Sequence, residues 1–450
     1  MKGTFTRTLV VVGLAAGLGA YAYFVEREKP AGDDKQKETL WSFEKPKVKA
    51  FGLEAAGQSV RAVKEAGSWK LTAPVAAPAD ASAVEALVDA LNGLKVEEVV
   101  TETPGDLADF GLANPKAVAR VEVEGQPKPF SLLVGEKAPD NSGLYAKTDD
   151  KPRVFLIASW LLTNFEKKPF DFRDRDLLHL KRDDVRTLQV AGPEGGYTLV
   201  KKGDGEWGFT EPLVTRASRW PVDSLLSAIE GLRFDAILSE DAKDLGPYGL
   251  AKPSRMLTLS LADGSQRKLE IGSETADKKW HARDALKSTV TAIPQALVDD
   301  LKKGMGELRQ KRLLDISTYE VEGFDVETDK GKLVYARSTS KGENDSEQRT
   351  WKRTAPDLKQ LDTSKVEDAL FKIGGIESVE FLDRPQTQAA YGLDKPALVL
   401  SLRLQGGKQA GLLEIGRKGE LAFARRNDDA TILRLEAAKA DELIQALGGL

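Results

Sequence analysis

The chain has 450 residues, of which 41% are hydrophobic and 30% are charged, and it contains no cysteine. This length accommodates about three domains of roughly 100 to 200 residues each. The formal net charge of −4 argues against nucleic acid as a partner, because phosphate binding requires clustered lysine and arginine. The lack of cysteine excludes disulfides, thiolate metal sites and cysteine nucleophiles.

The chain begins with a segment at residues 1–25 that we expect to anchor it as a single-pass protein in a membrane. Thr8–Val25 is uncharged and mostly apolar, and it follows Lys2 and Arg7. A helix of this length spans roughly 27 Å, close to the ~30 Å hydrocarbon core of a bilayer. Positive residues on the short side predict a cytoplasmic N-terminus and a periplasmic or otherwise extracytoplasmic body. In the alternative interpretation, Ala20-Tyr21-Ala22 is a cleavage site and residues 1–22 are a signal peptide.

A charged linker at residues 26–40 precedes one module that recurs three times, at residues 41–180, 181–316 and 317–450. Each module contains a Trp-x-x-x-x-Pro stretch, then an aromatic-Gly-Leu turn, then a proline three residues after the turn. The same motifs in the same order indicate a triplicated module. We assign structural roles to the recurring positions, which are Trp69, Trp207, Trp351, Gly111, Gly249, Gly392, Pro115, Pro253 and Pro396.

An amphipathic helix is predicted after each Trp-x-x-x-x-Pro stretch. Apolar residues recur there at helical spacing, with Leu91, Ile229 and Ile373 at the same position of the three copies. We expect these faces to pack into the core. The expected N-caps, whose side chains can accept an orphan amide hydrogen, are Asp80, Ser218 and Asp362.

Alternating strands are predicted after the aromatic-Gly-Leu turn, at residues 121–123, 257–261 and 398–404, and a second helix closes each module. Because the connections between strands are short, most pairs should be antiparallel. Gly203-Asp204-Gly205 indicates a hairpin turn, and the extra length of the third copy falls at residues 338–348, which we expect to be a polar loop. The predicted fold class is α+β, with three tandem repeats behind one N-terminal transmembrane helix. Each repeat should be a mostly antiparallel curved sheet with two helices on one face.

Glycine and histidine positions carry more specific predictions. A glycine in all three aromatic-Gly-Leu turns predicts positive φ at a place where a side chain is poorly tolerated. His281 occupies the position of Tyr145 and Phe423, so we interpret it as a ring that packs rather than as a ligand or general base. His179 has no recurring neighbour and is also interpreted as structural.

Three acids near the end of the first module could hold a metal ion. Asp171, Asp174 and Asp176 offer the oxygen ligands that Ca²⁺ prefers. The interleaved Arg173 and Arg175 favour neutralisation instead. The sequence therefore predicts no metal site.

Two further sets of recurring residues have a functional alternative. Lys147, Arg283 and Arg425 form either a repeated anion site or, as we favour, a strand-edge charge or salt bridge. The three recurring tryptophans form either a sugar-stacking platform or, as we favour, the anchors of three hairpins. The sequence has no phosphate-binding glycine loop and no Gly-x-Ser-x-Gly elbow, and we predict no catalytic residue and no cofactor.

The order of these motifs resembles a known bacterial family. The N-terminal anchor, Trp-x-x-x-x-Pro before a helix, Tyr-Gly-Leu-x-x-Pro, a strand ending in Ile-Gly and the Arg-Asp-x-Asp-Leu-Leu of Arg173–Leu178 are similar to domain-of-unknown-function family 4340. The resemblance covers nearly the whole chain after the anchor. It implies a membrane-tethered extracytoplasmic protein that works beside transport machinery of the ABC type, and it supplies no catalytic residues. The second copy departs from the last motif, with Arg312-Leu313-Leu314-Asp315.

Two functions from different classes remain. The first is a non-catalytic scaffold or binding subunit with a protein partner in a membrane complex, because interaction surfaces tolerate duplication while an active site needs one set of residues. The alternative is a cell-envelope enzyme that acts on glycans through a carboxylate pair. Carboxyl groups that face each other in a deep cleft would favour the enzyme, and shallow junctions between modules would favour the scaffold.

Overall fold

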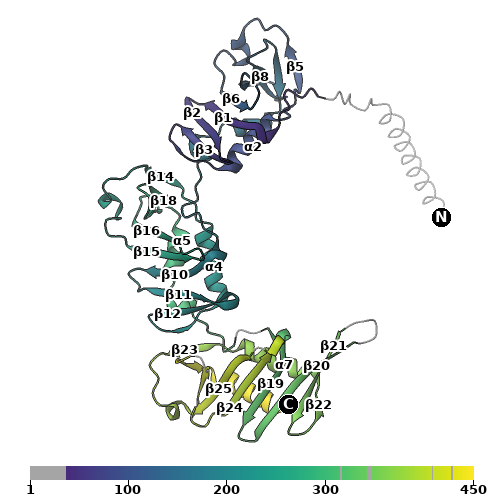
Figure 1. The fold of residues 1–450 in the computed structure, drawn as a ribbon, viewed down its shortest axis with the longest axis vertical. Coiled ribbons are helices and arrows are strands. Elements are labelled where there is room, and N and C mark those ends of the chain that lie inside the picture. The colour runs from purple at the N-terminus through teal and green to yellow at the C-terminus, as the bar shows by residue number, and fades with distance from the viewer. Residues whose placement is uncertain (1–36, 315–316, 342–346, 408, 427–428) are drawn as a thin grey trace, which may run out of the picture. The chain divides into compact units, whose positions relative to one another are not determined.

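The computed structural model describes residues 37–314, 317–341, 347–407, 409–426 and 429–450 (Figure 1). The chain divides into two compact units, Met1–Arg175 and Asp176–Leu450. The predicted anchor at Thr8–Val25 lies outside the described residues. Among the helices that are described, none combines the length and the apolar character needed to cross a membrane.

The first unit contains a nine-stranded antiparallel sheet. In spatial order its strands are β4 (Ala77–Pro78), β3 (Ser68–Ala73), β2 (Gln58–Glu65), β1 (Val48–Ala55), β6 (Ala117–Val123), β7 (Phe130–Lys137), β8 (Leu144–Thr148), β9 (Val154–Ile157) and β5 (Glu98–Thr101). Strand β6 alternates between buried and partly exposed residues, as its period-two pattern predicts. The α-helices described in this unit are α2 (Ala81–Leu91) and the single turn α3 (Leu162–Phe165).

The second unit contains two more nine-stranded antiparallel sheets. The strands of the second sheet, in order, are β13 (Thr215–Arg216), β12 (Glu206–Glu211), β11 (Tyr197–Lys202), β10 (Val185–Ala191), β15 (Arg255–Leu261), β16 (Gln266–Glu274), β17 (Trp280–Asp284), β18 (Val290–Ile293) and β14 (Ala236–Ser239). Its helices are α4 (Arg219–Glu230), α5 (Gln295–Lys302) and α6 (Met305–Leu308).

The third sheet has the same architecture. Its strands, in order, are β22 (Lys359–Gln360), β21 (Glu347–Ala355), β20 (Gly331–Lys341), β19 (Val321–Thr328), β24 (Leu398–Leu404), β25 (Gln409–Lys418), β26 (Leu421–Arg426), β27 (Ile432–Leu435) and β23 (Ser378–Leu382). Its helices are α7 (Thr363–Gly375) and α8 (Ala437–Gly448), and both bury residues in one core cluster with the sheet. All three sheets share one strand order, which confirms that the fold is repeated three times.

The first helix of each repeat supplies the core, as its apolar spacing predicts. Leu91, Ile229 and Ile373 are all buried. The Asp80 side chain accepts a hydrogen bond from the Ala83 amide, and the Asp362 side chain caps α7 in the same manner. Ser218 occupies the predicted N-cap position of α4, but its side chain makes no cap hydrogen bond.

The glycines of the aromatic-Gly-Leu turns are left-handed in every repeat. Gly111, Gly249 and Gly392 have φ of 66°, 67° and 68°. A Cβ on Gly249 would lie 2.8 Å from the Ser273 amide nitrogen, and one on Gly392 would lie 2.2 Å from the Arg417 carbonyl oxygen. The predicted positive φ and the poor tolerance of a side chain are therefore confirmed.

Residues 338–341 and 347–348, part of the polar loop expected in the third copy, form strands instead, and residues 342–346 lie outside the described residues. Strand β20 continues to Lys341 and pairs with β21, with Ser338 opposite Thr350 and Lys341 opposite Glu347. The added residues fall on both arms of the hairpin, so they extend the antiparallel ladder. Gly203–Gly205, in contrast, forms the predicted turn between β11 and β12.

Candidate functional site

The recurring tryptophans are buried rather than exposed on the surface. Trp69 and Trp207 are each 4% exposed and Trp351 is 1% exposed. The ring centroid of Trp351 lies 5.4 Å from that of Phe324 on β19. A sugar-stacking platform needs an exposed indole face, so this geometry supports hairpin anchoring. The proline that ends each Trp-x-x-x-x-Pro stretch follows a cis peptide bond in all three repeats.

The position of His281 holds an aromatic ring contact in each repeat. Tyr145 packs edge-on against Phe110, His281 against Tyr248, and Phe423 against Tyr391, with ring centroids 5.1, 5.4 and 5.1 Å apart. His281 Nδ1 also lies 2.8 Å from the Ser273 carbonyl oxygen. The imidazole is therefore held in place by packing and a backbone contact, which agrees with the predicted role as a packed ring.

The acids at the end of the first module act within their own turns. Asp171 accepts a hydrogen bond from the Lys168 amide, and Asp176 accepts hydrogen bonds from the amides of Leu178 and His179. Across the part of the chain that the structure describes, no group of three or more metal-ligating residues comes together.

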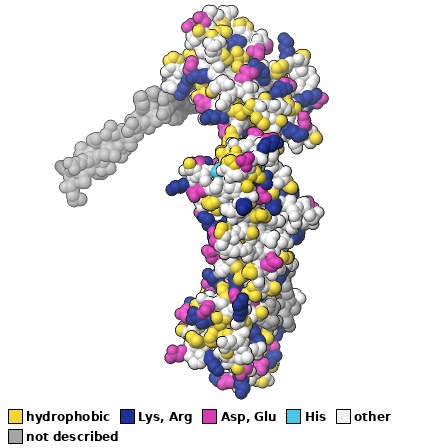
Figure 2. Space-filling model, turned by 90° about the vertical axis from the view of Figure 1, so that its left-hand side faces the viewer, with side chains coloured by type: hydrophobic (Ala, Val, Ile, Leu, Met, Phe, Trp, Pro, Cys, Tyr) yellow, Lys and Arg dark blue, Asp and Glu magenta, His cyan; other side chains and the backbone are white. Residues whose placement is uncertain are grey.

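The recurring basic position forms a cross-strand ion pair in two repeats. Arg283 on β17 pairs with Glu270 on β16, and Arg425 on β26 pairs with Glu414 on β25. Lys147 instead donates to the carbonyl oxygen of Thr148. Figure 2 shows basic and acidic side chains interspersed over the face in view. The salt-bridge interpretation thus holds for the second and third repeats.

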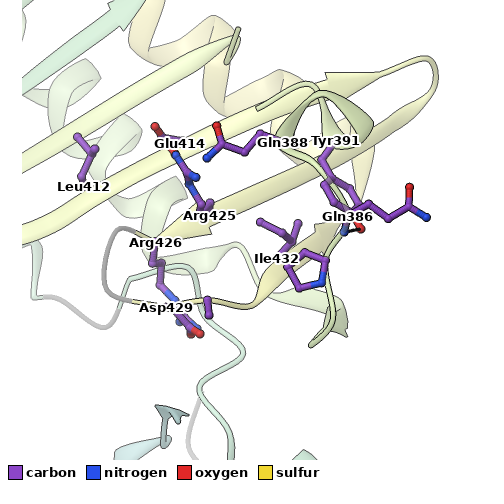
Figure 3. A pocket seen from close by; sticks show the side chains of 11 residues that line it. Gln386, Gln388, Tyr391, Leu412, Glu414, Arg425, Arg426, Asp429 and Ile432 are labelled. Atoms are coloured by element: carbon purple, nitrogen blue, oxygen red, sulfur yellow. Dashed lines mark hydrogen bonds and ion pairs between the residues drawn. The ribbon is translucent and has the colours of Figure 1, made fainter. Parts of the chain in front are cut away.

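A polar cavity of about 700 Å³ opens in the third repeat (Figure 3). Glu414 and Arg425 form one ion pair in its lining, and Arg426 and Asp429 form another. The Tyr391 hydroxyl accepts a hydrogen bond from the amide of Gln386. The lining residues are Pro385, Gln386, Gln388, Tyr391, Leu412, Glu414, Arg425, Arg426, Asp429, Ala430 and Ile432.

The Arg426–Asp429 pair that lines this cavity is buried. Arg426 is 1% exposed and Asp429 is 6% exposed, and Arg426 Nη2 lies 2.6 Å from Asp429 Oδ2. Burial by itself raises the pKa of Asp429, but the Arg426 guanidinium and hydrogen bonds from Thr431, Arg426 and Thr215 hold the pKa below its usual range. A carboxylic acid that donates a proton in catalysis needs the opposite shift, so this site favours a fixed charge over a general acid.

A family model described as "Domain of unknown function (DUF4340)" matches residues 69–219 and 207–396. Together the two matched segments cover more than half of the chain, and each begins at a recurring tryptophan. The chain belongs to the DUF4340 family. No curated protein in the comparison matches the chain. The recurring glycines and tryptophans lie within the two DUF4340 matches, whereas most of the residues that line the cavity lie beyond them.

A buried arginine joins the second and third repeats of this DUF4340 protein. Arg309, 3% exposed, donates to the hydroxyl oxygens of Thr215 (3.2 Å) and Thr431 (2.9 Å) and pairs with Asp383. Its guanidinium carbon lies 4.0 Å from the ring centroid of Phe381, within the range of a cation–π contact. Arg309 therefore holds Thr215 of the second repeat against strand and loop residues of the third.

Sequence reasoning missed Arg309, Arg426 and Asp429. One sequence signal was available for Arg309, because Arg173 and Arg309 each stand four residues before a Leu-Leu pair, at Leu177-Leu178 and Leu313-Leu314. The structure places both arginines alike, in bridges to Ala79 and Ala217. No comparable signal marks Arg426, whose partners come from the loop that follows it and from the end of the second repeat.

Proposed function

We propose that this DUF4340 protein is a non-catalytic scaffold or binding subunit tethered to the bacterial inner membrane. Its repeats lie on the extracytoplasmic side, where it is accessory to a transport complex of the ABC type. The observation that carries the non-catalytic role is the pairing within the third-repeat cavity. Its four charged side chains, Glu414, Arg425, Arg426 and Asp429, form two ion pairs with one another. Such groups orient a polar ligand or a partner but have little freedom to transfer protons.

The recurring residues support the same proposal. The tryptophans, the turn glycines and the ring at His281 all serve packing within their own repeat. A repeated interaction module requires residues that pack the same fold at the same positions in every repeat. The carboxylate-pair alternative gains no support from Asp429, whose pKa is lowered rather than raised.

The membrane tether rests on the sequence of the first 25 residues. The apolar run Thr8–Val25 has bilayer length, and Lys2 and Arg7 stand on its short side. The link to ABC-type transport rests on the family resemblance. N-terminal sequencing of the native protein tests the tether, because a start at Tyr23 with release into the soluble fraction would make it a free exported protein.

Crosslinking in native membranes tests the scaffold. A photo-crosslinking residue at an exposed apolar position, such as Trp220 (77% exposed) or Phe371 (76% exposed), should capture a membrane transport component. Substitutions of Glu414 or Asp429 to the matching amide should leave that crosslink in place. A glycan-hydrolysing activity of the purified protein that either substitution abolished would overturn the non-catalytic role and establish the enzyme.

A further inference from the structure

A second cavity, of about 620 Å³, opens in the first repeat beside the turn that joins β1 and β2. Its volume lies within the range of ligand pockets, roughly 300 to 1,000 Å³. The apolar part of its lining is Ala73 and Pro74 at the end of β3, and Pro169 and Phe170 in the turn after α3. Among the described residues that line it, only Lys168 is charged. We call this cavity the Phe170 pocket.

The ring of Phe170 has no counterpart in the second repeat. The N-cap amides of α2 and α4 donate to the carbonyl oxygens of Phe172 (2.9 Å) and Leu308 (2.7 Å), so these two residues hold equivalent positions. Two residues before them stand Phe170 in the first repeat and Gly306 in the second. Since glycine has no side chain, the second repeat lacks this wall at the matching position.

A second wall of the pocket also differs between these two repeats. Arg61 on β2 stands opposite Ala73 on β3. Thr198 on β11 stands in the same way opposite Glu211 on β12, and both Ala73 and Glu211 precede the cis-proline of their repeat, so they match. The Glu211 carboxylate accepts a hydrogen bond from the Thr198 hydroxyl (3.2 Å). The second repeat therefore has a glycine and an acid where the first has a ring and a methyl group, and a distinct function is expected where copies of one fold differ.

Positive charge lies at the Phe170 pocket and is available to a ligand. Lys168 is exposed, and within the part of the chain that the structure describes its ammonium group has no ion-pair partner. The guanidinium carbon of Arg175 lies 5.8 Å from the ring centroid of Phe170. The nearest acid in the sequence, Asp171, accepts a hydrogen bond from the Lys168 amide (2.8 Å) and so serves the turn itself. An acidic ligand group would therefore meet an available ammonium group, whereas a basic group would meet like charge.

We infer that the Phe170 pocket binds a segment of a partner protein in which an apolar side chain stands beside a carboxylate. This inference rests on the proposed scaffold function and deepens it by naming the surface and the chemistry of the partner. The apolar side chain packs against Pro74 and Phe170, and the carboxylate pairs with Lys168. Burial of the apolar side chain supplies affinity, and the ion pair supplies specificity. Because Gln58 and Lys168 are exposed where they line the pocket, a side chain of an extended segment can enter without any opening of the fold.

Three short peptides test the two contacts with the full chain. The probe carries a tryptophan followed by an aspartate, one control has lysine in place of the aspartate, and the other has alanine in place of the tryptophan. Titrations followed by saturation-transfer NMR of the peptides measure their binding. We expect both controls to bind at least about fivefold more weakly than the probe, equivalent to ~1 kcal/mol. No binding of the probe at millimolar concentration, or equal binding of the probe and either control, would overturn the inference.

Substitutions within the pocket assign the binding to this site. Phe170→Ala removes the ring and should weaken binding of the probe at least about fivefold. Ser59→Trp adds a ring at an exposed lining position and should weaken binding as much while every wall stays in place. Lys168→Gln should bring the probe and its lysine control to within about twofold of each other, and Lys128→Gln, at an exposed position of the same unit, should leave their difference unchanged. Unaltered binding of the probe to both Phe170→Ala and Ser59→Trp would overturn the site.

Crosslinking separates this inference from the scaffold proposal. A photo-crosslinking residue at Gln58 should capture, in native membranes, a partner segment that mass spectrometry identifies as an apolar residue beside an aspartate or glutamate. The probe peptide should reduce this crosslink. Partner capture at Trp220 or Phe371 without capture at Gln58 would overturn the pocket and leave the scaffold standing, and capture at none of the three would count against both. Capture at Gln58 of a lipid, of this chain itself or of a segment without the apolar and acidic pair would overturn the assigned partner.

Discussion

The first and third repeats share one strand order, yet the same pair of strands carries different chemistry in each. In the first repeat Leu133 on β7 stands opposite Lys147 on β8, and in the third Glu414 on β25 stands opposite Arg425 on β26. The next residue along β8 is Thr148, while its counterpart on β26 is the buried Arg426.

This difference separates two groups of positions within one module. In all three repeats the tryptophan is buried, the turn glycine leaves no room for a side chain, and two rings pack edge-on. Positions that face across β7–β8 or β25–β26 vary without any change in strand order. Function in this molecule is therefore expected at the positions that differ between repeats.

The largest expected effect tests the polar chemistry of the third repeat. Arg426→Met leaves Asp429 charged and buried without its partner, so it should lower the free energy of unfolding by about 3 to 5 kcal/mol. Thr148→Val, at the equivalent position of the first repeat, should cost no more than about 1 kcal/mol. Hydrogen exchange followed by mass spectrometry measures the local stability of each sheet in the full chain. Equal losses for the two variants would contradict the contrast.

The shared core should respond alike in every repeat. Leu91→Ala, Ile229→Ala and Ile373→Ala each remove a buried side chain that packs its helix on its sheet, and each should cost roughly 2 to 5 kcal/mol. The same exchange measurement applies to all three variants. Losses below about 0.5 kcal/mol at all three positions would show that these helix faces do not form the core.

The turn glycine should matter more than a glycine with similar φ and free space around it. In Gly249→Ala the alanine would have to adopt a left-handed backbone conformation, and its Cβ would crowd the Ser273 amide nitrogen. The substitution should therefore lower the free energy of unfolding by about 1 kcal/mol or more. Gly264 has φ of 82° with no atom within 4 Å of an added Cβ, so Gly264→Ala carries only the backbone penalty. Urea denaturation of both variants compares them. A greater loss for Gly264→Ala would refute the close-approach argument.

The smallest expected effect is a pH dependence confined to the unit that holds the third repeat. Because the folded-state pKa of Asp429 is lowered, its contribution is present above the unfolded pKa of about 3.9 and is lost as pH falls through the folded value. Asp429→Asn should therefore make the stability of residues 176–450 depend less steeply on pH in this acid range. Urea midpoints measured from pH 5 downward test this, and an unchanged slope would exclude Asp429 as a contributor.

Predictions from the sequence succeeded where a residue is dictated by its near neighbours. The apolar spacing around Leu91 and the glycine at position 111 are set by local backbone geometry, and both lie where the pattern predicts. The cap hydrogen bond expected from the Ser218 side chain is absent, although Ser218 stands at the N-cap position of α4, and nothing in the structure explains this difference from Asp80. Part of the loop expected at residues 338–348 is strand instead, because Ser338–Lys341 on one arm of the hairpin pair with Glu347–Thr350 on the other.

The sequence by itself determined a triplicated α+β module, its turns and its core faces, because periodicity and steric limits act over a few residues. Only the tertiary structure decided that Arg309 and Arg426 are buried, since their partners include Asp383, Thr431 and Gln310, which lie far away in the sequence. The pairing of the Asp80 amide with Phe172 and of the Ser218 amide with Leu308 also emerged only from the fold. Whether a backbone amide is paired depends on which distant segment returns to it, and a local pattern carries no record of that segment.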